Sequence, residues 1–276
     1  MNAVSGFVRH QRARGRGEIV VKPGGGETRL ERLYQEGCAK IRLPRPDQGP
    51  AEAVLINTAG GLTGGDEIAW QITAGARTAL VLTTQAAERV YRSLGDAARA
   101  RTTISVGEGA SVEWLPQETI LFEHSHLHRT LEVDLAPGAR FLALDAVLLG
   151  REAMGEAALS ARFRDDWRIR REGRLLHAEA TRLDPDPLVR DGLSLLRGAR
   201  AFATLVYVGP DAALKLEPLR RLSAASSAEA QLGVSLVGDR LVLRALAPGG
   251  LALRKAITPI MAALSAARTL PRLWTF

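Results

Sequence analysis

Apolar and polar residues alternate with a period of two along much of the first 180 positions, as in Glu-Ile-Ala-Trp-Gln-Ile at 67–72. This period predicts half-buried β-strands. A unit of strand, Gly-Ala turn and strand recurs three times, with a weaker fourth copy, at 72–85, 104–118, 133–145 and 169–179. Its glycines are at positions 75, 109, 138 and 173. Spacings of roughly thirty residues predict stacked hairpins or a solenoid-like stack of sheets.

Helical patterns are confined to the last third of the chain. Residues 211–225 carry leucines at near-helical spacing, and a second helix is predicted at 253–270, after Gly249-Gly250 and with Pro259 in its early turns. We therefore predict a mainly β fold of stacked sheets with two helices in the C-terminal third. The expected organisation is a flexible basic segment at 1–18 and one domain at 19–276, with a β body to about residue 209.

The stretch "NTAGGLTGGD" at 57–66 holds four glycines and invites comparison with a phosphate-binding loop. A P-loop needs a lysine after its last glycine and a helix behind it. Asp66 stands where that lysine would be, and a strand pattern follows. The stretch is therefore predicted to be strand, turn and strand, in which glycines supply positive φ or allow close backbone approach.

Composition is typical of a folded protein of the cytosol. The chain has 276 residues, 46% of them hydrophobic, and no apolar run long enough to cross a bilayer. The N-terminal arginines have no apolar segment behind them, which argues against a secretory signal. The single cysteine, Cys38, excludes an internal disulfide and suits a reducing compartment, so we expect a cytoplasmic location and no membrane partner.

The net charge of +7 and a pI near 10.2 raise the question of nucleic-acid binding. Beyond the N-terminal run, however, the arginines are dispersed among acidic residues, and neither a recognition helix nor an aromatic stacking platform is evident. The basic excess is better interpreted as a surface that could meet an acidic protein. Nucleic acid is not expected as a partner.

Polar or acidic residues end the second strand of each unit, and stacking of the units would align them. Asp145 is the sharpest case, because residues 141–149 are otherwise apolar on both faces and predict a buried strand. A lone carboxylate there costs several kcal/mol unless it is paired, hydrated or bound to a metal. A buried pair with an arginine, such as the nearby Arg151, is the alternative to a functional role, and both stay open.

The segments "LINTAGGLTGGD", "TTQAAERVYRS", "LPQETILF", "LLGREAMGE" and the "LPR" at 43–45 resemble the signature segments of the urease accessory protein UreD family, called UreH in some bacteria. The resemblance spans about Gly26 to Trp274. It implies a cytosolic, non-enzymatic scaffold with no tightly bound cofactor. Such a scaffold binds apo-urease, recruits UreF and through it the GTPase UreG, and helps nickel reach urease. A dimer of the accessory complex is compatible with it.

The resemblance also places four acids near an internal passage of the family. Nickel would be held there transiently, because scattered oxygen ligands and water release a metal more readily than a closed cage does. Arg92, in "VYRS", is a candidate counter-charge. The four acids are Asp66, Glu118, Asp145 and Glu179.

The tail "PRLWTF" at 271–276 ends in two aromatics that look exposed, Trp274 and Phe276. It is either disordered or docks on a partner, and we predict that it belongs to the surface that meets UreF.

"HSHLH" carries His124, His126 and His128, which on one face of a strand could bind zinc or nickel. The motif follows Phe122-Glu123, where a hairpin tip is expected, so a solvent-exposed loop is favoured. An enzyme would need a nucleophile with a base, and neither G-x-S-x-G nor H-E-x-x-H occurs. A hydrolase hypothesis would rest on the scattered carboxylates alone.

Overall fold

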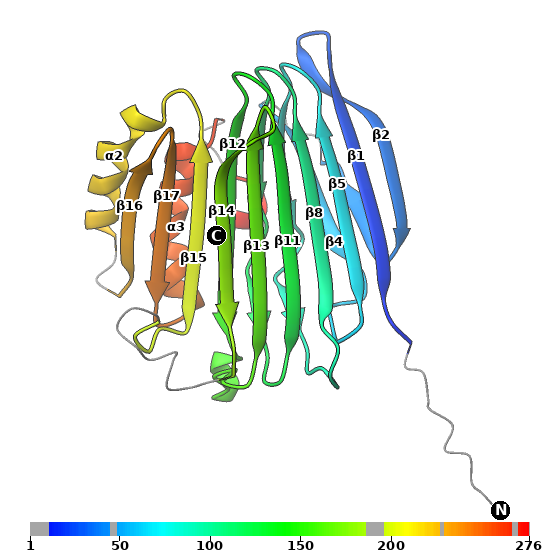
Figure 1. Ribbon diagram of the computed structural model, residues 1–276, viewed down its shortest axis with the longest axis vertical. Coiled ribbons are helices and arrows are strands. Elements are labelled where there is room, and N and C mark those ends of the chain that lie inside the picture. The colour runs from blue at the N-terminus through cyan, green and yellow to red at the C-terminus, as the bar shows by residue number, and fades with distance from the viewer. Residues whose placement is uncertain (1–10, 45–48, 186–195, 227–228, 267–269, 276) are drawn as a thin grey trace, which may run out of the picture.

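The computed structural model describes residues 11–44, 49–185, 196–226, 229–266 and 270–275, which form two packed β-sheets with two helices on one of them (Figure 1). The helices are α2 (Ala212–Ala225) and α3 (Gly250–Leu264). The prediction of a mainly β, stacked fold with two helices in the C-terminal third is confirmed. The second helix ends at Leu264, six residues before its predicted end.

The two sheets contain nearly all of the secondary structure. The first sheet has the order β14 (Arg174–Leu183), β13 (Arg162–Arg171), β11 (His126–Leu135), β8 (Ala98–Val106), β5 (Glu67–Ala74), β1 (Arg14–Gly24) and β2 (Glu27–Gly37). The second has the order β16 (Gln231–Val237), β17 (Arg240–Ala247), β15 (Ala201–Val208), β12 (Arg140–Leu149), β9 (Ser111–Leu115), β6 (Ala79–Thr84), β4 (Ala51–Asn57) and β3 (Ala39–Arg42). Beside it lie β7 (Glu88–Val90) and β10 (Thr119–Leu121), and 3-10 turns occupy Glu152–Met154 and Arg272–Trp274.

The recurring units are arches between the sheets. In the first three units the two strands lie in different sheets, and each pairs in parallel with the equivalent strand of the next unit. The turns stack too: the Gly107 N–H donates to the Ala74 carbonyl at 2.8 Å, and the Ala136 N–H donates to the Val106 carbonyl at 2.9 Å. The solenoid-like alternative is therefore right for these units. Only the fourth copy, β13 with β14, is an antiparallel hairpin.

The glycine-rich stretch at 57–66 is a turn between strands, as predicted. Gly60, Gly61 and Gly65 have φ of 77°, 150° and 86°, a region that other residues rarely adopt. Gly64 has no such φ but is closely packed, because a β-carbon there would lie 2.1 Å from Ser93 Oγ. The glycines thus serve backbone geometry and close packing.

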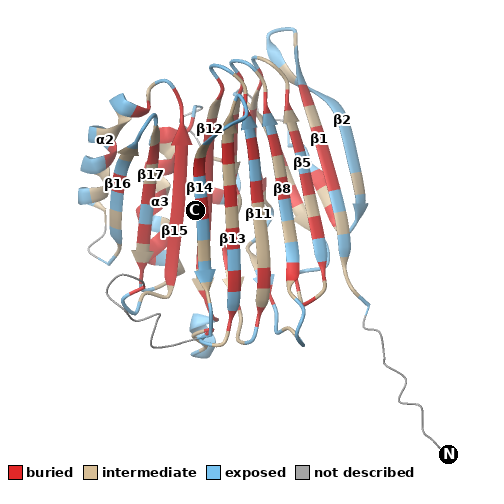
Figure 2. Cartoon of the chain, viewed as in Figure 1, coloured by how far each residue is buried: buried red, intermediate tan, exposed pale blue. Residues whose placement is uncertain are grey.

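Two hydrophobic cores share the second sheet. Alternating burial along the strands of the first sheet is visible in Figure 2 as red and blue bands. Strand β12 is buried on both faces: Phe141 and Val147 face the core between the sheets, whereas Leu142 and Leu144 face the core under the helices. Full burial of such side chains stabilises the fold by about 1.5–3 kcal/mol each. This doubly buried strand carries Asp145.

The predicted boundary of the N-terminal segment needs correction. Strand β1 begins at Arg14, so residues 14–18 belong to the first sheet and not to a flexible segment, whereas residues 1–10 lie outside the described residues. The part after residue 210 also contains the hairpin of β16 and β17. None of the helices in the described ranges has the length and apolar character that a membrane span requires.

Candidate functional site between the sheets

An ion-pair cluster interrupts the core between the sheets. Arg129 of β11 and Asp165 of β13 occupy inward positions of the first sheet, opposite Asp145 of the second. Arg129 Nη2 lies 2.5 Å from Asp145 Oδ1 and 2.9 Å from Asp165 Oδ2. Arg129 Nε also donates to Asp165 Oδ1 at 3.0 Å, and Trp167 Nε1 donates to Asp165 Oδ2 at 2.8 Å. Asp165 is thus held by three donors and Asp145 by one ion pair.

Burial perturbs the protonation of this cluster. Asp145 is 5% exposed and Asp165 is 1% exposed. Burial raises the pKa of Asp145 to about 7; Arg129 acts against this rise and Asp165 adds to it. Burial by itself would lower the pKa of Arg129, but the two carboxylates raise it, so the guanidinium stays charged. Asp145 therefore exchanges a proton in the neutral range.

The cluster lines a cavity of about 70 Å³ between the sheets, which has room for a few water molecules. Its polar walls include Arg129, Asp145, Glu88 and Gln117. The amide nitrogen of Gln117 makes no hydrogen bond with the described residues, although the residue is only 7% exposed. A buried amide without a protein partner is able to bind water or a solute that enters the cavity.

A second carboxyl group of the cavity wall, beside that of Asp145, belongs to Glu88 in β7. Burial raises the pKa of Glu88 to about 7, whereas a hydrogen bond from Asn57 Nδ2 at 3.1 Å and the charge of Arg129 act to lower it. Glu88 and Asp145 thus line the cavity beside one guanidinium, which also holds Asp165. When these carboxyl groups are ionised, their charge exceeds that of Arg129, so the cavity attracts protons or cations.

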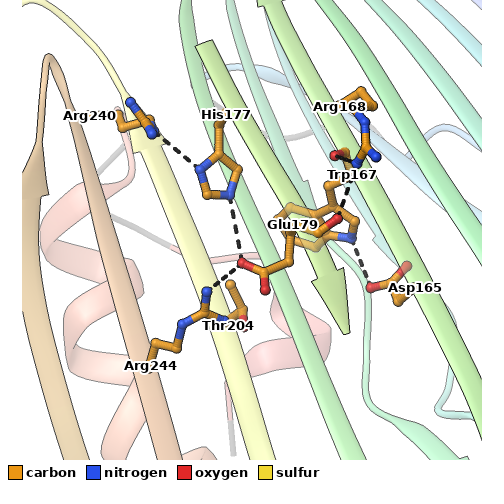
Figure 3. A network of polar contacts seen from close by, with 8 residues as sticks. All are labelled: Asp165, Trp167, Arg168, His177, Glu179, Thr204, Arg240 and Arg244. Atoms are coloured by element: carbon orange, nitrogen blue, oxygen red, sulfur yellow. Dashed lines mark hydrogen bonds and ion pairs between the residues drawn. The ribbon is translucent and has the colours of Figure 1, made fainter. Parts of the chain in front are cut away.

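Glu179 of β14 lies in a second cluster, where the edge of the first sheet meets the face of the second (Figure 3). Arg244 Nη2 lies 2.5 Å from Glu179 Oε2, and Arg244 Nη1 donates to Thr204 Oγ1 at 2.9 Å. Arg240 Nε donates to His177 Nδ1 at 3.1 Å. Burial, reinforced by the charge of Arg240, lowers the pKa of His177, so its ring is neutral at pH 7. Here one carboxylate has one arginine of its own.

The two clusters are neighbours in both sheets. Glu179 pairs in register with Trp167, two residues from Asp165, and Asp145 pairs with Thr204, which binds Arg244. The structure therefore brings Asp145 and Glu179 into one polar layer between the sheets.

Asp66 and Glu118 lie elsewhere. Asp66 accepts the backbone N–H groups of Ala13 and Thr63, both at 2.8 Å, and so ties the start of β1 to the glycine turn. Glu118 lies 3.1 Å from Arg254 of α3, on the helix side of the second sheet. Within the described ranges, no hydrogen bond or ion pair joins either acid to Asp145 or Glu179. The expected alignment of all four acids is wrong in this respect.

The expected counter-charges also need correction. Arg151 pairs with Glu156, not with Asp145, whose partner is Arg129. Arg92 is exposed and forms no ion pair with any of the four acids in the described part of the chain. The arginines that do the pairing come from strands or helices that face the acids across a core.

The tail is packed against the second sheet. Trp274 is fully buried, its Nε1 donates to the Leu115 carbonyl at 2.9 Å, and the guanidinium of Arg254 stacks 4.4 Å from its ring. The expectation of an exposed Trp274 is therefore wrong, because this indole fills the core under the helices. Phe276 lies outside the described residues. A role of either aromatic in partner binding stays a prediction.

The three histidines do not gather. His124 is exposed in a turn with φ of 58°, as expected for a loop, but His126 and His128 belong to β11. His126 Nδ1 lies 3.1 Å from the Gly95 carbonyl, and His128 Nε2 lies 3.3 Å from Asp166 Oδ2. Among the described residues, no three His, Cys, Asp or Glu side chains converge to hold a metal.

Arg129, Asp165 and Glu88 were not among the residues predicted from the sequence. Two of them could have been recognised from the sequence pattern. Arg129 lies two residues from Leu127 and from Leu131, and Asp165 lies two residues from Phe163 and from Trp167. Each is therefore a charged residue at an inward position of an alternating strand. Such a charge needs a partner across the core.

Fold and cluster together define a two-sheet β-solenoid protein with a charged internal cavity. Residues 13–275 match the model of the family described as UreD urease accessory protein. A urease accessory protein UreD of Chelativorans sp. (strain BNC1) is 59% identical over 265 residues, covering 96% of this chain and 95% of the relative. Those of Sinorhizobium medicae (strain WSM419) and Agrobacterium fabrum (strain C58 / ATCC 33970) are 51% and 49% identical, covering 96% and 97% of this chain and 96% and 93% of the relatives. The chain belongs to the UreD family of urease accessory proteins.

Proposed function

We propose that this protein is a non-catalytic maturation factor of urease that works in the cytosol. It binds the urease apoprotein, recruits UreF and through it the GTPase UreG, and lets nickel pass between its two sheets on the way to urease. Nickel is its cargo, held only in transit. Membership of the UreD family supports the role in maturation.

The observation that carries the nickel part is the excess of buried carboxyl groups over guanidinium in the inter-sheet cavity. Asp145 and Glu88 both have pKa raised to about 7 by burial, and Arg129 is the cation beside them. A purely structural ion pair would not need the additional carboxyl groups. A site that accepts and releases a divalent cation does, because it must give up protons when the cation enters and regain them when it leaves.

The residues at the cavity have different roles in this proposal. Arg129 donates two N–H groups to Asp165, and Trp167 donates a third, so Asp165 is fixed in place. Asp145 keeps fewer protein contacts and is the carboxyl group best placed to change partner. Carboxylate, amide and hydroxyl oxygens bind Ni²⁺ less tightly than cages of thiolate or imidazole ligands do, so the release of nickel stays fast.

The layer continues from the cavity through Thr204 to Glu179 and Arg244. The Arg244 side chain is 56% exposed, so this end of the layer reaches solvent. We infer that a cation leaves or enters here, with Arg244 releasing Glu179 as it passes.

Co-expression tests the proposal as a whole. Urease expressed with UreF and UreG but without this chain should lack nickel and activity, and the wild-type chain should restore both. The chain should also co-purify with UreF and with urease subunits. Full nickel occupancy in urease made without the chain, at the same nickel supply, would contradict the proposed role.

A further inference from the structure

A band of exposed arginines crosses the outer face of the first sheet. Strands β1, β5, β8, β11 and β13 are parallel, and their outward residues alternate with the buried core positions. At the N-terminal ends of these strands, the lower end in Figure 1, the outward positions are rich in arginine. We call this set the basic end; it consists of Arg14, Arg16, Arg99, Arg101, Arg162 and Arg164.

The register places these arginines in rows across the sheet. Arg14 pairs with Glu67, Glu67 with Arg99, Arg99 with His128, and His128 with Arg164. Neighbouring strands lie about 4.8 Å apart, so the arginines of this row repeat about every 10 Å. Across the hairpin, Arg164 stands directly opposite Arg182. Of these neighbours, Arg14 and Arg99 flank Glu67, an arrangement of opposite charges that stabilises a sheet, whereas Arg164 and Arg182 are like charges in directly opposite positions, which destabilise it.

Within the described part of the chain, none of the six arginines forms an ion pair, and all are exposed. On these five strands the acids in their rows are Glu67 and Asp166, and Asp166 lies against His128 at 3.3 Å; on the adjacent strand β2, Glu36 stands opposite Arg16. Arg14, Arg16, Arg99 and Arg101 line a shallow hollow of about 620 Å³ together with Glu36 and Glu67. Its floor includes Ala69.

The other end of the same face is balanced. There the outward acids on these strands are Glu18, Glu132 and Asp134, and the outward bases are Lys22, Arg168 and Arg170. The positive charge is therefore concentrated at one end of one face and is not a general property of the surface.

We propose that the basic end docks an acidic protein surface whose carboxylates repeat about every 10 Å, matching the arginine rows. Glu67 and Asp166 favour a protein over nucleic acid, because a phosphate backbone would meet their charge whereas a protein surface can place a base opposite them. No Phe, Tyr or Trp lies in these rows on the five strands to stack on a base, and the ring of Tyr34 on the adjacent strand β2 is covered by the Arg16 guanidinium, 5.9 Å from its centroid.

The size of the basic end limits what it contributes to binding. From Arg14 to Arg164 it spans four strand spacings, about 19 Å, and it covers only about two outward positions along each strand, so its area is well below the usual contact of about 800 Å² per partner. Charges of this kind mainly speed the encounter and make it salt-dependent. The inference rests on the proposed function in one respect, because the urease apoprotein is taken as the partner with the acidic surface.

Association kinetics with immobilised urease apoprotein test the inference on the full chain. The variant Arg99→Glu/Arg164→Glu should associate at least tenfold more slowly than wild type at 50 mM salt and show a flatter salt dependence. The two should converge at high salt, where the Debye length falls to about 3 Å at 1 M. The matched control, Arg168→Glu/Arg170→Glu, changes the same charge on the same face and should stay within about threefold of wild type. If the first variant does not fold, Arg99→Gln/Arg164→Gln replaces it, and its association should be slowed by a smaller factor.

Each other outcome overturns the inference in a distinct way. Equal rates for the basic-end variant and its control would show that only net charge matters. A variant that binds urease normally but loses binding to random duplex DNA would assign the basic end to nucleic acid. A wild-type chain that does not bind the apoprotein at any salt would remove the proposed function and this inference together.

Discussion

Asp145 and Glu118 are both buried carboxyl groups in contact with an arginine, on opposite faces of the second sheet. Glu118 has Arg254 at 3.1 Å, and the same guanidinium stacks on Trp274, so charge and packing are balanced. Asp145 shares Arg129 with Asp165, beside Glu88 and a cavity. We interpret an acid with its own arginine in a filled core as one that stabilises the fold, and acids in excess of arginine beside a cavity as those proposed to exchange protons and cations.

Removal of Arg129 should have the largest effect on stability. Arg129→Met leaves Asp145 and Asp165 buried without a counter-charge, which should lower the free energy of unfolding by the upper end of about 3–5 kcal/mol. Denaturant unfolding at pH 7 measures it. Arg101 is exposed and forms no ion pair within the described ranges, so Arg101→Met is the control and should shift stability by about 0.5 kcal/mol or less. A small loss for Arg129→Met would mean that water, not Arg129, stabilises the two acids.

Loss of the buried Trp274 side chain, on the helix side of the second sheet, should have the second-largest effect on stability. Trp274→Ala removes a fully buried indole and its hydrogen bond to Leu115. We expect a loss near the lower end of about 3–5 kcal/mol, because the site lies at the end of the chain and can relax. Leu273→Ala, at a 37% exposed position, should cost much less. Thermal unfolding of the two variants decides this.

The same variants sharpen the predicted contact with UreF. Weaker binding of UreF by Leu273→Ala, at normal stability, would support a direct contact of the tail. Weaker binding by Trp274→Ala alone would follow from loss of the fold.

The pH dependence of stability should separate Asp145 from an ordinary surface acid. The pKa of Asp145 is raised in the folded state, so the stabilisation by its bound proton is complete below its unfolded value near 4 and is lost as the pH rises towards about 7. Relative to Asp145→Asn, wild type should therefore lose stability over this range, by at most about 1.4 kcal/mol per pH unit. Unfolding free energies of both proteins at several pH values measure this.

Asp211 offers a control of opposite sign. Burial acts to raise its pKa, but hydrogen bonds, above all from Tyr207, outweigh burial and lower it. Wild type should therefore lose stability relative to Asp211→Asn as the pH falls below about 4. A flat difference between wild type and Asp145→Asn from pH 4 to 7 would contradict the assigned protonation.

The strand alternation and the repeated turns were enough to predict the layered β fold, because a buried face imposes its period on the sequence. The partner of Asp145 was not predictable in the same way. Arg151 is near it in the chain, but an inward side chain meets the strand that faces it across the core, and the stacking of the arches decides which strand that is. Trp274 looked exposed for a similar reason, since nothing local shows that the tail folds back over β9.

Urease activation by Asp145→Asn, measured beside Glu118→Gln, tests the central claim most directly. Asp145→Asn keeps the shape of the side chain and at pH 7 should change stability by about 1 kcal/mol or less, because Arg129 retains Asp165. We predict normal assembly with UreF and UreG, but lower urease activity and nickel content per unit of assembled complex. Glu118→Gln should lose stability by about 1–3 kcal/mol and activate normally once assembled. Normal activation by Asp145→Asn at equal complex would contradict a nickel route through the inter-sheet cavity.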